Sequence, residues 1–379
     1  MIVRILKNID FSILFAVLAL SAFGTVMVYS ASMVSGVMVY DVTPGYFFEK
    51  QLLSWGLGIG ALFFGIIFPY KNYRRLFKLI LLVTVILLGM VFVIGQTTNN
   101  AQSWISLPLI GRFQPAELAK MSLIIYLAAI YTKKSSYIQD FTRGLLPPMI
   151  ITMLVVAMIL KQPDLGTAVI ALAVSGLIIM SSGLKKSHLF FMLGLVLVAA
   201  VTMYQFGLSE EQLSRFDGAY QPFEYADDAG YQLINSYLAI HNGGIIGTGL
   251  GAGVQKLGYL PEAHTDFIMA VIAEELGIIG VAVVIGLIAL IVLRGFYVSM
   301  NSHDTFGRLL SIGVSGLIGI QAVINLGGLT GLIPLTGVPL PFVSFGGTSL
   351  LMMMFSAGIL INIHAISKIK KNQEERAAA

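Results

Sequence analysis

The sequence predicts an all-α polytopic membrane protein with about ten transmembrane helices, both termini in the cytoplasm and one long extracytoplasmic loop between the seventh and eighth helices. Of its 379 residues, 57% are hydrophobic and 11% are charged. The mean hydropathy is +0.87. Such a chain has too little polar surface to cover a soluble globule. Apolar segments of about 20 residues, the length that crosses ~30 Å of hydrocarbon, recur along nearly all of it.

The ten expected spans follow from these apolar segments, in chain order. They are residues 11–31, 51–68, 77–94, 115–132, 145–160, 167–182, 188–207, 267–293, 309–328 and 349–366. The first is longer than the apolar core of a signal peptide, which has about 7 to 15 residues, so we expect an uncleaved anchor. The fifth and sixth are short and close together, so a re-entrant hairpin over residues 145–182 is the alternative. In the second, Gly56 and Gly60 suit close helix approach.

Basic residues set the orientation, because Lys and Arg accumulate in cytoplasmic loops. Most of them fall on one side of the ten-span topology: Arg4, Lys7, Lys71, Arg74, Arg75, Lys78, Lys133, Lys134, Arg143, Lys185, Lys186, Arg294, Arg308, Lys368, Lys370, Lys371 and Arg376. The opposite side keeps Lys50, Arg112, Lys161, Arg215 and Lys256. Both termini are therefore expected in the cytoplasm. The net charge of +4 reflects this topology and does not indicate nucleic-acid binding.

We expect one membrane domain over residues 1–379, because no soluble stretch is long enough to carry its own core. The long extracytoplasmic loop, residues 208–266, contains a helix-like run at residues 231–241. Its aromatic residues argue against disorder. Residues 367–379 form a basic cytoplasmic tail. The chain has no cysteine, which excludes disulfides, thiolate metal sites and thiol chemistry.

The first polar constellation is residues 100–120, NAQSWISLPLIGRFQPAELAK. Pro115 suits the first position of a helix and Gln114 its cap. Glu117 and Lys120 are three residues apart and share one face inside the membrane. They form either an internal ion pair that holds helices together, or a cation at the bottom of a polar cavity, with Glu117 keeping Lys120 charged.

Two further segments carry polar groups at the outer side. In residues 162–167, QPDLGT, Asp164 is either a turn or cap residue or a group of a polar cavity. In residues 336–349, TGVPLPFVSFGGTS, prolines and glycines prevent a regular helix. Irregular backbone at membrane depth is tolerated only against protein or a wet cavity. The hydroxyls of Ser344 and Thr348 are candidates to line that cavity.

Asp266 stands where the long loop turns into an apolar helix, within YLPEAHTDFIMAVIAEELG at residues 259–277. Ionisable groups near membrane depth are rare and usually line cavities or substrate paths. The alternative is that Thr265 and Asp266 cap the helix. Five histidines offer no paired metal spacing, although a divalent ion near His264 and Asp266 is an open possibility. The GTGLGAG run at residues 247–253 follows no strand, so it is not a dinucleotide loop.

The chain resembles the SEDS family of bacterial cell-wall proteins, named for shape, elongation, division and sporulation. The resemblance covers nearly the whole chain and rests on the ordered motifs NAQSWISLP, QPAELAK, QPDLGTA, GYQLINS, YLPEAHTDFI, EELG and TGVPLPFVSFGGTSLL. The segments at residues 9–32 and 134–140 look more like the division members of Firmicutes than the rod-elongation members. Phe345 and Thr348 depart from the usual tyrosine and serine, a conservative difference.

The resemblance implies a ten-helix peptidoglycan glycosyltransferase that polymerises lipid II on the outer face of the cytoplasmic membrane, at the division septum. It further implies a class B penicillin-binding protein as partner, supplying transpeptidation, alongside other divisome membrane proteins. Asp266 matches the family's essential aspartate and Trp104 a tryptophan needed for activity. Glu117, Lys120 and Asp164 match polar positions of the central cavity.

The chemistry of that reaction gives the remaining expectations. Asp266 would deprotonate the acceptor hydroxyl. Lys120 and Arg215, or a divalent cation such as Mg²⁺ or Mn²⁺, would stabilise the leaving pyrophosphate. His264 and Ser344 complete the expected substrate-binding group. The two alternatives are a lipid II flippase, which needs essential polar groups on both membrane faces, and a non-catalytic divisome scaffold.

Overall fold

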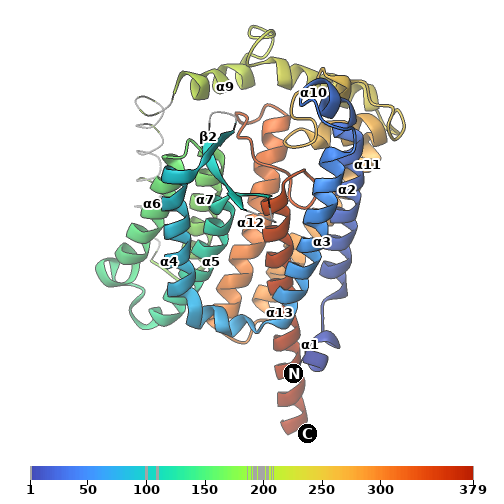
Figure 1. The fold of residues 1–379 in the computed structure, drawn as a ribbon. Coiled ribbons are helices and arrows are strands. Elements are labelled where there is room, and N and C mark those ends of the chain that lie inside the picture. Colours follow the sequence, from blue (N-terminus) through green and yellow to red (C-terminus); the bar gives the residue numbers. More distant parts are fainter. Residues whose placement is uncertain are drawn as a thin grey trace.

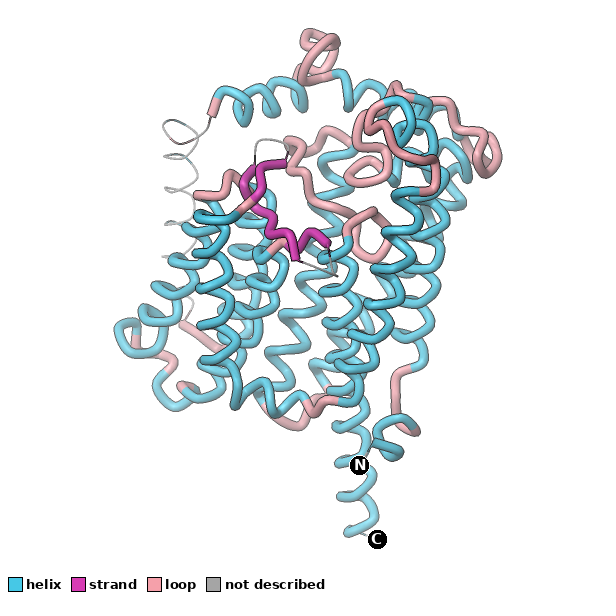
Figure 2. The backbone as a smooth tube through the Cα atoms, in the orientation of Figure 1, coloured by secondary structure: helices cyan, strands magenta, loops and turns pink. Residues whose placement is uncertain are grey.

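The structure is a computed structural model that describes residues 2–98, 101–107, 111–185 and 209–378, with isolated positions between 187 and 207. In the described ranges the chain is a bundle of long helices with a small sheet and short helices at one end (Figures 1 and 2). The helices are α1 (Ile2–Leu6), α2 (Phe11–Met38), α3 (Tyr46–Ile67), α4 (Tyr70–Ile94), α5 (Pro115–Lys133), α6 (Leu146–Leu160), α7 (Leu165–Ser181), α9 (Glu210–Tyr220), α10 (Tyr231–Gly243), α11 (Ile268–Met300), α12 (Thr305–Leu329) and α13 (Gly347–Ala378). Short turns of helix are η1 (Ser135–Tyr137), η2 (Phe141–Leu145) and η3 (Gln255–Leu257).

The expected spans coincide with these helices, apart from residues 188–207, which lie outside the described ranges. Seven helices of the described part are long and apolar enough to cross a membrane. Two more, α5 and α7, match expected spans but are less apolar or shorter, with 19 and 17 residues. The π-helical η2 runs directly into α6, and Phe141–Leu160 together makes a 20-residue candidate span. Residues 145–182 therefore form two helices, α6 and α7, joined by a short turn, and the expectation that both cross the membrane stays a prediction.

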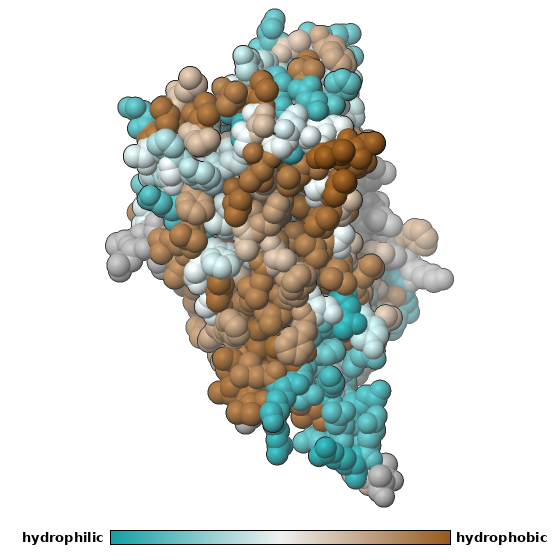
Figure 3. Space-filling view, turned by 90° about the vertical axis from the view of Figure 1, so that its right-hand side faces the viewer, coloured by the Kyte–Doolittle hydropathy of each residue, from teal (hydrophilic) through white to brown (hydrophobic). Residues whose placement is uncertain are grey.

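Both ends of the chain lie at one end of the bundle, while α9, α10 and β2 lie at the other (Figure 1). This arrangement agrees with two cytoplasmic termini and an extracytoplasmic loop. Viewed from the side, hydrophobic residues cover the middle of the surface and hydrophilic residues gather toward its ends (Figure 3). That pattern is expected of a surface that faces lipid at mid-height and water at both ends. The chain is thus a multi-pass membrane protein.

Close contact between α3 and α13 forms part of the core, and the glycines that allow it differ from those expected. A Cβ on Gly65 would come within 2.7 Å of the Phe355 carbonyl oxygen, and one on Gly58 within 2.5 Å of the Met354 sulfur. Gly56 and Gly60 have no neighbour within 4 Å. The prediction for Gly56 and Gly60 was wrong because both lie on the outward face of α3, whereas Gly58 is buried.

The long loop folds back onto the outer part of α11. Both carboxylates of the EELG motif are buried and bind this loop. Glu274 accepts hydrogen bonds from the backbone amides of Val254 and Gln255. A Cβ on Gly243 would lie 1.8 Å from the Ala273 carbonyl oxygen, so this contact requires glycine. The glycine-rich run at residues 247–253 is therefore explained by its packing against α11.

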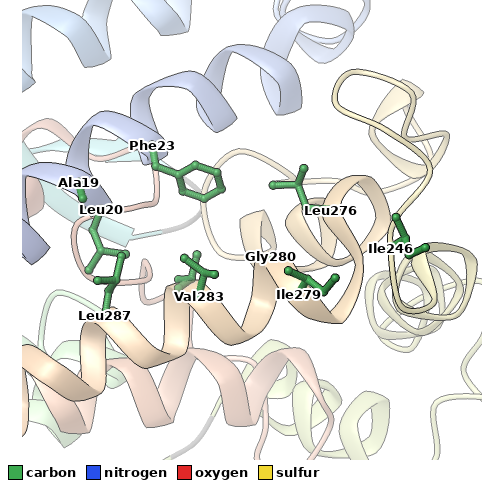
Figure 4. Close-up of a pocket in the computed structure, with 10 residues that line it drawn as sticks. Ala19, Leu20, Phe23, Ile246, Leu276, Ile279, Gly280, Val283 and Leu287 are labelled. Carbon is green, nitrogen blue, oxygen red and sulfur yellow. The ribbon is translucent and has the colours of Figure 1, made fainter.

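An apolar groove lies on the outside of the bundle between α2 and α11 (Figure 4). Its volume is about 450 Å³. It is lined by Ala19, Leu20, Phe23, Ile246, Leu276, Ile279, Gly280, Val283, Val284 and Leu287. None of these side chains carries a polar group, so the groove belongs to the lipid-facing surface and has no groups for acid–base chemistry.

Candidate functional site

The irregular segment between α12 and α13 lies at the centre of the candidate site. After α12 ends at Leu329, residues 336–346 return along this helix and reach Gln321, about 12 Å below its end at 1.5 Å per residue. The segment packs against several helices. A Cβ on Gly24 of α2 would come within 2.6 Å of the Val343 backbone, and one on Gly166 of α7 within 2.5 Å of the Thr336 carbonyl oxygen.

Asp266 precedes α11 and does not cap it. The cap position is Phe267, and no side chain bonds to the first amides of the helix. The Thr265 hydroxyl donates instead to the carboxylate of Glu262, 2.7 Å away. The predicted capping role of Thr265 and Asp266 was therefore wrong, because a turn at Glu262 uses the threonine and the helix starts later. A Cβ on Gly337 would lie 3.7 Å from Asp266 Oδ2, so the carboxylate lies beside the irregular segment.

The surroundings of Asp266 favour its protonated form. The pKa of Asp266 is raised to about 7: burial is the largest cause, the negative charge of Glu262 also raises it, and the positive charge of Arg215 lowers it. A carboxyl with a pKa near neutral can both take up and release a proton under physiological conditions. Arg215 lies on α9 and pairs with Glu211 at 3.1 Å. It reaches Asp266 through its electric field and makes no hydrogen bond to it in the described structure.

Glu117 and Lys120 form an ion pair inside the bundle. Lys120 Nζ lies 2.8 Å from Glu117 Oε1, and both side chains are almost fully buried. The same ammonium donates to Gln321 Oε1 on α12, also at 2.8 Å. In the described part of the chain Glu117 Oε2 has no hydrogen-bond partner. The pair thus holds α5 to α12 and leaves one buried acceptor, and the cavity role of Lys120 stays a prediction.

Asp164 caps α7 and also contacts the start of α5. Its carboxylate accepts hydrogen bonds from the Thr167 amide at 3.0 Å and from Gln114 Nε2 at 2.9 Å. Burial raises the pKa of Asp164, with Lys120 lowering it and Glu117 raising it. Gln114, which bonds Asp164, also accepts from the Glu117 amide, so Asp164 lies near the Glu117–Lys120 pair. The capping role is confirmed, and Asp164 also belongs to the polar group.

Trp104 lies on the small sheet at the extracytoplasmic end of the bundle (Figure 2). The sheet has the order β1 (Gln96–Thr98), β2 (Ala101–Leu107) and β3 (Gly111–Phe113), with antiparallel pairing. Trp104 pairs across the ladder with Gln96 and is half-buried. Because β3 leads into α5 through Gln114, the strands place Trp104 on the same side as Asp266. No hydrogen bond joins these two side chains within the described ranges.

Ser344 and His264 both take part in hydrogen bonds of the irregular segment. The Ser344 hydroxyl accepts a hydrogen bond from the Leu340 amide at 2.8 Å, so it closes a turn of the irregular segment. The His264 ring is buried 4.4 Å from the ring centre of Phe47, and burial lowers its pKa. The His264 carbonyl accepts a hydrogen bond from the Phe345 amide. Their expected contact with substrate stays a prediction.

Two amides on α12 connect these groups, and the sequence analysis missed them. Gln321 accepts from Lys120 and donates Nε2 to the Pro339 carbonyl at 2.9 Å. Asn325 donates Nδ2 to the carbonyls of Asp266 at 2.9 Å and Val338 at 2.8 Å. The signal was present: two amide side chains stand one helical turn apart in the apolar stretch IGIQAVINLGG. The described ranges hold no cluster of three or more metal-binding side chains.

Comparison with known proteins gives consistent results. The family FTSW_RODA_SPOVE, described as cell cycle protein, matches residues 11–369. The probable peptidoglycan glycosyltransferase FtsW of Bacillus subtilis (strain 168) is 45% identical, covering 99% of this chain and 95% of that protein. Stage V sporulation protein E of the same organism is 35% identical, covering 95% and 98%.

Solved structures share the fold. One is a peptidoglycan synthase complex, described with the words "Structural coordination of polymerization and crosslinking by a peptidoglycan synthase complex". Its matching chain has a TM-score of 0.76 and 27% identity, covering 95% of this chain and 98% of that one. The rod shape determining protein RodA of Thermus thermophilus has a TM-score of 0.69 and 28% identity, covering 94% and 96%.

Proposed function

We propose that this chain, which belongs to the FTSW_RODA_SPOVE family of cell cycle proteins, is a peptidoglycan glycosyltransferase. It polymerises lipid II on the outer face of the cytoplasmic membrane. The observation that carries the site assignment is the Asp266 carboxyl. It lies beside an irregular backbone segment at the extracytoplasmic end, and its pKa is raised to about 7. A group of this kind at this depth is suited to proton transfer.

Glycan extension needs one proton transfer and one bond exchange. Asp266 takes the proton of the acceptor sugar hydroxyl as its oxygen bonds to the anomeric carbon of the donor. The bond from that carbon to the pyrophosphate oxygen breaks, and the lipid pyrophosphate leaves with the electron pair. A positioned carboxylate base typically contributes ~10²- to 10⁴-fold to the rate.

Lys120 would meet the charge that gathers on the leaving group. Its ammonium has two described partners, Glu117 and Gln321, and an ammonium has three hydrogens to donate. A third hydrogen bond to a phosphate oxygen would be strengthened by the low dielectric of the bundle interior. Arg215 on the overlying α9 would add positive potential from above.

We propose that a divalent cation binds here only together with the substrate. Glu262 is the carboxylate whose charge acts on Asp266, and Mg²⁺ commonly binds one or two carboxylates together with substrate phosphates. Glu262 would hold Mg²⁺ or Mn²⁺, which would neutralise phosphate charge, while Asp266 acts as the base. Chelation with EDTA in the polymerisation assay, followed by return of either metal, tests this role.

We further infer that the chain works beside a class B penicillin-binding protein and other divisome membrane proteins at the septum. A similar chain belongs to a complex described as coordinating polymerization and crosslinking. This similarity supports a crosslinking partner for the present chain. The chain's similarity to FtsW proteins supports the division site.

Reconstitution with purified lipid II tests the proposal. The wild-type chain with its partner should polymerise glycan, and Asp266→Asn should lose nearly all of the rate while unfolding at a similar temperature. Asp227→Asn, an exposed aspartate of the same loop, is the matched control and should keep the rate. Polymerisation by Asp266→Asn at the wild-type rate would overturn the base assignment.

A further inference from the structure

Gln321 and Asn325 lie one turn apart on α12 and connect the two halves of the candidate site. Gln321 contacts Lys120 at 2.8 Å and the Pro339 carbonyl at 2.9 Å. Asn325 contacts the Asp266 carbonyl at 2.9 Å and the Val338 carbonyl at 2.8 Å. Both amides are almost fully buried. Hydrogen bonds therefore link Glu117 to the Pro339 carbonyl through Lys120 and Gln321, and Asn325 links the adjacent Val338 carbonyl to the backbone of Asp266.

The segments that these amides hold have little regular structure of their own. Residues 332–346 contain no helix or strand, and Asp266 follows a run of turns that starts after η3. Backbone of this kind has no ladder of hydrogen bonds to fix its position. The helix α12 is regular from Thr305 to Leu329, so amides that project from it provide a rigid reference.

The buried side-chain oxygen of Asn325, Oδ1, has no hydrogen-bond partner in the described structure, whereas its Nδ2 group has two. This difference indicates that the Nδ2 donor is the group that the site uses. A buried acceptor left unpaired costs about 1–3 kcal/mol. An apolar side chain would avoid this cost but would leave the Asp266 and Val338 carbonyls without their donor.

We propose that Asn325 and Gln321 are positioning residues that set the place of the Asp266 carboxylate relative to the Lys120 ammonium. Asn325 bonds to the backbone of Asp266, and Gln321 bonds to the Lys120 ammonium. Both amides also bond to the Val338–Pro339 backbone between them. This inference rests on the proposed function, because it assigns the two amides to the same reaction. Neither amide needs to touch the substrate.

The test compares Asn325→Ala and Gln321→Leu with a matched control. The control is Asn362→Ala on α13, because Asn362 is also a fully buried asparagine that bonds backbone, accepting from the Tyr70 amide and donating to the Ile66 carbonyl. Purified complexes are assayed with lipid II for kcat and KM, and the melting temperature is recorded for each. Asp266→Asn is assayed in parallel.

The two α12 variants should lower kcat by ~10- to 100-fold with KM nearly unchanged, the size of loss expected when reacting groups shift by about 1 Å. The control should lower the melting temperature and keep kcat per folded molecule. Asn325→Ala should also move the acid limb of the pH–rate profile to lower pH, since a displaced Asp266 is less buried and its pKa falls toward its ordinary value. A merely structural role would leave this limb in place.

The outcomes separate the two claims. Wild-type kcat in Asn325→Ala or Gln321→Leu, with Asp266→Asn inactive, would overturn the positioning role alone. Activity in Asp266→Asn would overturn the proposed function itself. If Asn325→Ala or Gln321→Leu fails to fold, Gln321→Glu keeps an acceptor for Lys120, loses the donor to Pro339 and adds a negative charge beside Lys120. Its kcat should still fall, and an unchanged value counts against the proposal.

Discussion

Lys256 Nζ lies 2.5 Å from Glu275 Oε1, and both side chains are buried, with 1% and 0% of their surface exposed. Ser30 of α2 completes the contact, since its hydroxyl donates to Glu275 and accepts from Lys256. The ion pair therefore joins the long loop to α11 and α2 outside the polar group around Asp266. Substitutions in this ion pair should change the stability of the protein without altering the residues of the proposed reaction.

Lys256→Met should destabilise the protein strongly. It leaves the Glu275 charge buried without its partner, which typically costs about 3–5 kcal/mol. The double variant Lys256→Met/Glu275→Gln should recover part of the loss. Thermal unfolding of the purified protein measures both. Lys161→Met, at an exposed lysine, is the control. Equal melting temperatures for Lys256→Met and this control would contradict the prediction.

The rate of polymerisation should depend on pH through Asp266. Because its pKa is raised to about 7 and a base must be deprotonated, the rate should fall about tenfold per pH unit well below pH 7. The same shift affects stability in the opposite direction. The folded state binds this proton more tightly than the unfolded chain, so the contribution is present at low pH and is lost as pH rises through about 7.

Asp266→Asn checks the sign of this effect. The asparagine is neutral at every pH. The melting temperature of Asp266→Asn should therefore exceed that of the wild type by an amount that grows from pH 5 to pH 8. Asp227→Asn should show no such growth. A gain for Asp266→Asn that shrinks toward pH 8 would show that the carboxylate is stabilised, and not destabilised, by its surroundings.

Glu262 and Arg215 should move the acid limb of the pH–rate profile in opposite directions. The negative charge of Glu262 raises the pKa of Asp266 and the positive charge of Arg215 lowers it. Glu262→Gln should therefore shift the limb to lower pH and Arg215→Gln to higher pH. The Arg215 shift should shrink in high salt, because this side chain is exposed. Shifts of the same sign would rule out the electrostatic arrangement.

Gly166→Ala should displace the irregular segment. Its Cβ would lie 2.5 Å from the Thr336 carbonyl oxygen, and overpacking of this kind costs typically about 1–3 kcal/mol. Gly176 on the same helix has no neighbour within 4 Å, so Gly176→Ala should be neutral or stabilising. The two variants are compared by melting temperature and by polymerisation rate. Similar values for both would mean that the segment yields to the added methyl group.

Much of the fold was predictable because it follows from length and composition. Apolar runs predicted the long helices of the described ranges and the basic residues predicted their orientation, whereas the short helix α9 and the three-stranded sheet were not predicted. The Glu117–Lys120 pair follows from a spacing of three within one helix, and the Asp164 cap from its place before α7. Such relationships are local, so the sequence carries them directly.

The contacts that organise the site were not predictable in the same way. Asn325 bonds to Asp266 across 59 positions of the chain, and no periodicity reports which carbonyl a buried amide will meet. The cap of α11 was misjudged because Glu262, with a φ of 54°, forms a turn in which the Thr265 hydroxyl bonds to Glu262. That turn depends on the tertiary surroundings of residues 259–267 and leaves no pattern in the sequence.

The irregular segment of residues 336–346 contacts α2 and α7 as well as α12, and it is made near the end of translation. A ribosome-bound chain that has inserted its first helices already holds Glu117, Lys120, Asp164 and Asp266, but lacks the backbone that packs between them. We expect truncations before residue 336 to insert in the membrane and to be inactive. We therefore expect enzyme activity to begin only once almost the whole chain has been made, so that unfinished copies do not act on the precursor.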